Sequence, residues 1–224
     1  MGQILEFILH LDQHIYTLFT EHGTLTYLII CLILFCETGL VITPFLPGDS
    51  LLFATGVAVA NIRQDALEKG AMTTDLPNIW IMIPLMILAV FIGDNVNYFM
   101  GSKIGVRLFE MKIPFLKKEY LHRTERFYEK HGGKTVILAR FIPIIRTFAP
   151  FVAGLGAMNY KKYISFCIGG GVSWVTLMTL LGYFFGGLPF VRNHFETVII
   201  AVIFLSLLPI LVEYLINRYK ERKR

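Results

Sequence analysis

Long apolar stretches alternate with short polar ones along this chain. Apolar residues run from Thr24 to Cys36, and later runs fill residues 79–100, 163–188 and 197–217. A helix needs about 20 apolar residues to cross a bilayer, so these runs predict membrane-spanning helices. Hydrophobic residues make up 55% of the 224 residues, more than an ordinary soluble domain contains. The pattern predicts an all-α polytopic membrane protein.

The polar stretches predict the boundaries of the membrane domain. Apolar residues at helical spacing within residues 3–20 predict an amphipathic helix lying in the membrane interface, assigned to residues 1–22. Residues 23–216 form a single transmembrane domain, and residues 217–224 form a basic tail. Residues 61–78 are expected to be a polar connection. The run at 79–100 is expected to be interrupted at Gly93-Asp94-Asn95 and at Asn97.

Prolines within apolar runs predict two broken segments. Because proline removes a backbone hydrogen bond, the helix is expected to kink or stop at each. Lys and Arg concentrate in residues 103–134 and in the tail, which places both in the cytoplasm. Residues 135–158 then enter and leave the membrane on one side, as a re-entrant hairpin that turns near Pro143 to Pro150. The expected breaks are Pro44, Pro47, Gly48, Pro143, Pro150 and Gly154.

A second re-entrant hairpin is expected near residues 37–60, because the two halves of the chain share a pattern. Phe45-Leu-Pro47 corresponds to Phe141-Ile-Pro143, and Tyr98-Phe-Met-Gly101 to Tyr183-Phe-Phe-Gly186. Broken segments at matching positions of two inverted repeats indicate a transporter's binding site. The fold expected is therefore two inverted repeats, each with a hairpin.

Charged residues inside the apolar runs are the candidate site. A charge within hydrocarbon costs several kcal/mol, so its presence there indicates a function. Arg140 and Arg146 lie in the second hairpin, and Glu37 lies in the first apolar run. Asp49 precedes a fresh apolar stretch, where helix capping explains it equally well. Asp94 is a third acidic candidate. The four residues Glu37, Asp49, Arg140 and Arg146 are alternatively a structural ion-pair network.

Other classes of site find little support in the sequence. The net charge of +5 is concentrated in one loop and the tail, so it indicates membrane topology before nucleic-acid binding. Cys31, Cys36 and Cys167 lack metal-ligand spacing. No nucleophile motif accompanies the arginines, so we expect no enzyme, metal or cofactor. A lipid-phosphate phosphatase is the rival in the enzyme class.

Four stretches resemble one family over roughly residues 5 to 215. They are CETGLVITPFLPGDSLLF, GDNVNYFMG, FYEKHGGKTVILARFIPIIRTFAPFVAGLGAMNY and GYFFG. They are similar to the DedA family of bacterial inner-membrane proteins, close to the DedA branch itself, which shares its domain with VTT (SNARE-associated Golgi) lipid scramblases. The resemblance implies a lipid transporter with two facing hairpins. It implies functional acids at Glu37 and Asp49 and functional arginines at Arg140 and Arg146.

Residue chemistry and resemblance together predict the function. Arg binds phosphate in bidentate fashion, so Arg140 and Arg146 are expected to hold a lipid phosphate. Glu37 and Asp49 would exchange a proton or pair with these arginines. The expected activity is transport of undecaprenyl phosphate across the bacterial inner membrane. The expected partners are this lipid, protons and membrane lipids, and a homo-oligomer is one expected assembly state. The alternatives are a phospholipid flippase or scramblase, for example of phosphatidylethanolamine, and a proton-dependent ion or drug transporter.

Overall fold

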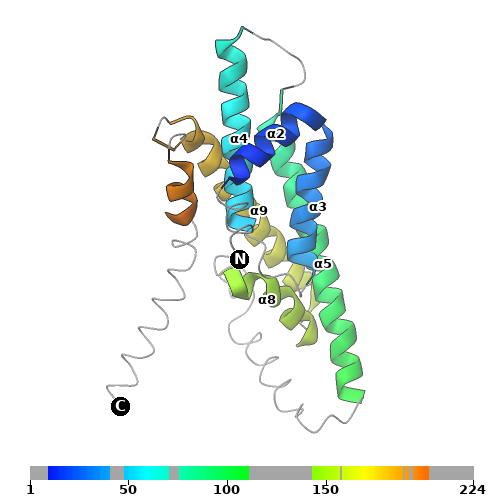
Figure 1. Ribbon diagram of the computed structural model, residues 1–224. Helices are drawn as coiled ribbons and strands as arrows, with labels where there is room; N and C mark the ends of the chain where they lie inside the picture. The colour runs from blue at the N-terminus through cyan, green and yellow to red at the C-terminus, as the bar shows by residue number, and fades with distance from the viewer. Residues whose placement is uncertain are drawn as a thin grey trace, which may run out of the picture. The chain divides into compact units, whose positions relative to one another are not determined.

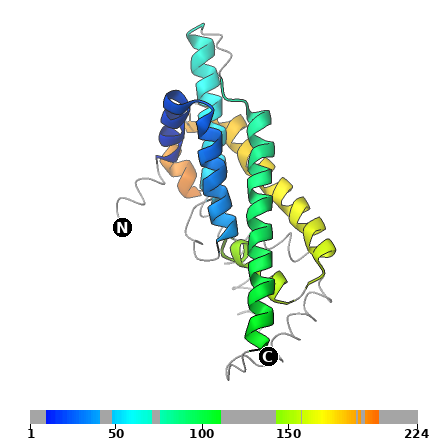
Figure 2. The ribbon, with the colours of Figure 1, turned by 90° about the vertical axis from the view of Figure 1, so that its right-hand side faces the viewer.

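A computed structural model describes most of the apolar part of the chain, and no strand occurs in that part. The described residues are 10–40, 48–70, 76–110, 143–156, 158–188, 190–191 and 194–201. The helices are α2 (Leu11–His22), α3 (Leu25–Gly39), α4 (Gly48–Glu68), α5 (Ile79–Glu110), α8 (Pro143–Leu155) and α9 (Tyr160–Gly186) (Figures 1 and 2). A short helix also covers residues 195–201. Pro44, Pro47, Arg140, most of the basic loop and the tail lie outside the described residues.

Among the described residues, two helices are long and apolar enough to cross a membrane. They are residues Ile79–Ile104 of α5 and Tyr160–Gly186, the whole of α9, while α3 is apolar but shorter. Along α5, exposed apolar side chains recur every three or four residues: Ile81, Leu85, Leu88, Ile92, Val96 and Phe99. Exposing an apolar stripe of this length to water would cost free energy, whereas contact with lipid tails would not. The all-helical fold is therefore confirmed for the described residues, with two candidate membrane-spanning helices among them.

The described residues fall into two compact units that interleave along the chain. Within the described residues, unit 1 draws on positions between 10 and 30, between 48 and 85, and between 175 and 201, and unit 2 on positions between 31 and 40 and between 86 and 174. The helices α3, α5 and α9 are each divided between the two units, with one end in unit 1 and the other end in unit 2. Inverted repeats and re-entrant hairpins remain predictions, since the segments that would close the hairpins lie outside the described residues.

In unit 1, α4 is the central helix and α2 packs against it. Most of α4 between Gly48 and Ile62 is buried. The helix α2 buries Leu11, Ile15 and Phe19, and the Tyr16 hydroxyl donates a hydrogen bond to the Asp65 carboxylate (2.9 Å). The amphipathic pattern at the N-terminus is confirmed for residues 11–22. Its apolar face covers α4.

The start of each later segment follows from local sequence. Gly23 adopts a left-handed conformation (φ +52°) after α2, which a glycine tolerates best, and the chain then turns into α3. At α9, the Asn159 side chain accepts a hydrogen bond from the backbone N–H of Lys161 (3.0 Å), which caps the helix N-terminus. Lys161, Lys162 and Tyr160 at this end are residue types typical of a membrane interface.

Several predicted boundaries are wrong because helices continue through polar sequence. The expected polar connection at 61–78 is helical as far as Glu68, and α5 runs unbroken through Gly93-Asp94-Asn95 and Asn97 and through residues 103–110 of the expected loop. Arg, Gln, Ala, Leu and Glu, which favour helix, supply much of the 61–68 extension. Within a helix, backbone hydrogen bonds are satisfied locally, so polar side chains do not end it.

The expected turn between Pro143 and Pro150 is also wrong. Pro143 is the first residue of α8, a position that tolerates proline because its missing N–H would have no helical partner. Pro150 lies inside α8, which continues to Leu155 and thus also contains Gly154. Gly48, by contrast, begins α4, which agrees with its prediction as a break residue.

Candidate functional site

The site lies in unit 2, where α5 holds α3 and α8 at close range. A Cβ atom at Gly93 would collide with the Thr38 hydroxyl on α3, and one at Gly101 would collide with the Phe151 carbonyl on α8. Gly154 of α8 meets the Tyr98 carbonyl in the same way. Small residues let helix backbones approach closely in membranes. These contacts position the C-terminal end of α3 and the helix α8 on α5.

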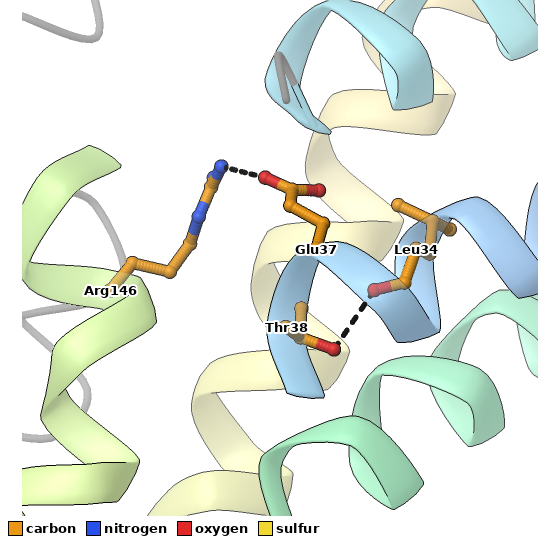
Figure 3. A network of polar contacts seen from close by, with 4 residues as sticks. All are labelled: Leu34, Glu37, Thr38 and Arg146. Atoms are coloured by element: carbon orange, nitrogen blue, oxygen red, sulfur yellow. Dashed lines mark hydrogen bonds and ion pairs between the residues drawn. The ribbon is translucent and has the colours of Figure 1, made fainter. Parts of the chain in front are cut away.

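An ion pair joins α3 to α8 across 109 residues of sequence. The Arg146 guanidinium donates from Nη2 to Oε1 of Glu37 at 2.7 Å (Figure 3). Only 4% of the Arg146 side chain and 1% of the Glu37 side chain are exposed. The expectation that Glu37 is the partner of an arginine is confirmed for Arg146.

Helix ends set the electrostatics around the pair. Glu37 lies in the last turn of α3, where the carbonyl ends of the peptide dipoles favour a cation, and Arg146 supplies one. Arg146 lies near the start of α8, where backbone N–H groups favour an anion. The Thr38 hydroxyl donates back to the Leu34 carbonyl (2.9 Å), as Figure 3 also shows. The arrangement can hold a negative group against Arg146.

A tryptophan covers the Arg146 guanidinium from one side. The Arg146 Cζ atom lies 4.3 Å from the centroid of the Trp174 ring, and Trp174 is 1% exposed. A cation over an indole face is attracted by the ring quadrupole, about 2 kcal/mol when desolvated. Arg146 is therefore held by Glu37 at its edge and by Trp174 at its face.

Asp94 is buried in a second polar cluster of unit 2. The Cys167 thiol donates to Oδ2 of Asp94 (3.4 Å), and the Tyr163 hydroxyl donates to the Asp94 backbone carbonyl (3.0 Å). The Tyr163 ring stacks on Tyr98 (4.4 Å between centroids), whose hydroxyl donates to the carbonyl of Met158. Asp94 is therefore buried among the side chains of Tyr163 and Cys167, and its role as a functional acid stays a prediction.

Comparison with known proteins places this arrangement in a family. The VTT domain model matches residues 46–184, which include Arg146 and Trp174 and leave Glu37 just outside. Protein DedA of Escherichia coli K12 is 48% identical over 211 residues, covering 94% of this chain and 91% of the relative. The chain belongs to the VTT-domain family. Within the family it is close to the DedA branch, as the sequence motifs indicated.

Further relatives carry membrane-protein names. An uncharacterized membrane protein of Mycobacterium tuberculosis H37Rv is 42% identical over 184 residues, which is 82% of this chain and 76% of the relative. Inner membrane protein YqjA of E. coli K12 is 35% identical over 164 residues, which is 73% of this chain and 69% of the relative. No solved structure matches the chain. These names agree with a bacterial membrane protein.

Of the other predicted site residues, Asp49 belongs to unit 1 and Arg140 lies outside the described residues. Asp49 lies in the first turn of α4, half-buried. Its capping role and its role as a proton carrier both remain predictions. Among the described residues, no group of three His, Cys, Asp or Glu side chains is placed to hold a metal ion.

Sequence reasoning missed two residues of the site. Trp174 reads as one more apolar residue of a membrane span, and nothing in its sequence context links it to Arg146. Asn97 reads as a polar interruption of the apolar run at 79–100, although its side-chain amide donates to both α3 and α8. A buried amide in an apolar run was a usable signal, since polar groups within membrane helices tend to bond across helices.

Proposed function

We propose that this VTT-domain protein is a membrane lipid transporter that moves undecaprenyl phosphate across the bacterial inner membrane. In this proposal Arg146 holds the lipid phosphate and Glu37 competes with the phosphate for Arg146. The observation that carries the proposal is the buried pair of Glu37 and Arg146 at 2.7 Å. No chemical step is required of the protein.

Stability alone is a poor account of the pair. Removing two charges from water costs several kcal/mol per ion, and replacing a buried pair with apolar side chains is often neutral or stabilising. The cost is felt more strongly in a membrane domain, where apolar side chains are the ordinary filling. A pair retained under these conditions is better explained by a need for a charge that can be exposed to a ligand.

Protonation of Glu37 would switch the site. A neutral carboxyl no longer balances Arg146, which then binds an anionic phosphate while the lipid tails remain in the bilayer. Loss of the proton restores the carboxylate, which displaces the phosphate. Because the phosphate would occupy Arg146 only while Glu37 carries a proton, one proton and one lipid would be bound at the same time, and transport would be coupled to protons. Arg140 would add a second phosphate contact, and Asp49 and Asp94 would serve as further proton carriers.

The proposed topology keeps the predicted inverted repeats and hairpins. The N-terminus of α8, with Arg146 in its first turn and a half, would be one hairpin arm that presents N–H groups to the phosphate. The N-terminus of α4, with Asp49, would be the matching arm of the other repeat. The basic tail would lie in the cytoplasm.

Binding of undecaprenyl phosphate to purified protein tests the proposal. We compare the parent chain with Arg146→Lys and Arg146→Gln, and with Lys161→Gln as a control that removes an exposed charge. A charge-assisted hydrogen bond contributes about 1.5–3 kcal/mol, so Arg146→Gln should weaken binding about tenfold to a hundredfold. The Lys variant should bind with intermediate affinity, because it keeps the charge without the planar fork.

Competition separates the alternatives. Undecaprenol, phosphatidylglycerol and phosphatidylethanolamine are added in excess as competitors. Displacement by phosphatidylethanolamine at equal concentration would indicate a general phospholipid flippase. Equal binding by the parent chain and Arg146→Gln would refute the phosphate site. Proton flux in vesicles that lack undecaprenyl phosphate would then favour the ion transporter.

A further inference from the structure

Asn97 connects the two backbone segments that carry the ion pair. Its side chain is fully buried, and Nδ2 donates to the backbone carbonyl of Thr38 on α3 (2.9 Å) and of Thr147 on α8 (2.7 Å). Thr38 directly follows Glu37, and Thr147 directly follows Arg146. Since only the nitrogen of an amide can donate, the two carbonyls fix which way the amide faces.

Each of the two carbonyls lies at or beside a point where its helix lacks a backbone donor. Thr38 lies in the last turn of α3, so its carbonyl has no N–H partner within the helix. In α8, Pro150 lacks the N–H that would bond the Arg146 carbonyl, which weakens the turn that contains Thr147. One side chain of α5 thus supplies a donor to a carbonyl that α3 leaves without one, and a second donor in the α8 turn that Pro150 weakens.

Stability does not account for this amide. Its two hydrogen bonds favour the fold, but its Oδ1 atom is buried with no hydrogen-bond partner among the described residues. A buried acceptor without a donor opposes the gain from the two bonds. What an apolar residue cannot do at this position is fix the separation of two backbones.

We infer that Asn97 is a positioning residue: it sets the spacing of α3 and α8 at which Glu37 meets Arg146 and Arg146 lies on Trp174. Glycines bracket it on the same face of α5, with Gly93 against α3 and Gly101 against α8. The glycines allow the backbones of α3 and α8 to approach α5 closely, and the two hydrogen bonds of Asn97 fix the separation between α3 and α8. The effect on lipid binding rests on the proposed function, whereas the effect on the pair does not.

The emission of Trp174 reports the position of Arg146 without any lipid. The chain has two tryptophans, and Trp80 is 65% exposed, so Trp80→Phe leaves Trp174 as the only tryptophan, which is excited selectively over tyrosine. In this background we compare Asn97→Leu, which keeps the volume without donors, with Asn97→Ser, which keeps one donor. The control is Asn95→Ala. Asn95 donates within α5, to Phe91, and accepts from Tyr160.

We expect Asn97→Leu to shift Trp174 emission in the same direction as Arg146→Gln does. The emission of Asn97→Ser should lie between those of the parent and the Leu variant. The emission of Asn95→Ala should equal that of the parent. Undecaprenyl phosphate binding should weaken about tenfold in the Leu variant, the effect of misplacing one charged hydrogen bond. Circular dichroism and gel filtration establish that each variant is folded.

Parent-like emission in the folded Leu and Ser variants would overturn the inference. Should the Leu variant not fold, the Ser variant decides in the same way. A shifted emission with unchanged lipid binding would support the positioning role and refute the proposed phosphate site, so that the two failures are distinguishable.

Discussion

The ion pair of Glu37 and Arg146 should behave as a single energetic unit. Glu37→Leu leaves Arg146 charged and Arg146→Met leaves Glu37 charged, in a site where the Arg146 and Glu37 side chains are 4% and 1% exposed. Leaving one buried charge without its partner costs about 3–5 kcal/mol. The double variant removes both charges, and such apolar replacements are often neutral. We therefore expect the double variant to be no less stable than either single variant.

The coupling free energy between Glu37 and Arg146 should be large enough to measure. If the two effects were independent, the double variant would lose about 6–10 kcal/mol, twice the cost of one unpaired charge. A coupling free energy of at least about 3 kcal/mol is expected instead. It is measured as a double-mutant cycle from reversible unfolding in mixed detergent and SDS micelles, followed by circular dichroism. Glu68→Gln, which removes an exposed carboxylate bonded to Gln64, is the control and should change stability by less than about 0.5 kcal/mol.

An additive cycle would refute this reasoning. If each single variant lowers the free energy of unfolding only as much as the Glu68→Gln control does, the pair is solvated. Arg146 is then available to ligands without protonation of Glu37. If the singles are costly but additive, each residue is held by other partners, and the exchange of Glu37 for a phosphate loses its energetic basis.

Two further predictions use the same unfolding assay. Gly93→Ala should destabilise by about 1–3 kcal/mol, because the added methyl overpacks α3 against α5, whereas Gly169→Ala, with open space around it, should not; equal effects would contradict the close contact. Burial raises the pKa of Asp12 above 3.8, so ionising it opposes folding and stability should rise as pH falls from neutral through the raised pKa. Asp12→Asn should therefore be more stable than the parent at neutral pH, with the advantage shrinking toward pH 3.8; an advantage independent of pH would contradict the assignment.

The fold class and several of the candidate site residues could be predicted from the sequence. Apolar length predicts membrane helices, and the cost of charge in hydrocarbon marks Glu37 and Arg146 as candidates by residue type and position alone. The sequence also located the start of a new helix at Gly48 and Asp49, where α4 begins. It failed on helix ends at Glu68 and Glu110, because polar residues in a helix keep its backbone hydrogen bonds intact.

Only the tertiary structure decided which residues meet. The pairing of Glu37 with Arg146 joins positions 109 residues apart, and the sequence offered several acids for two arginines. Asn97 and Trp174 entered the site only once α3, α8, α5 and α9 were placed. The physical reason is that membrane helices are apolar on every side, so the periodicity that orients a helix in a soluble protein is weak. Glycine contacts and single polar groups set the packing instead, and their partners lie far away in sequence.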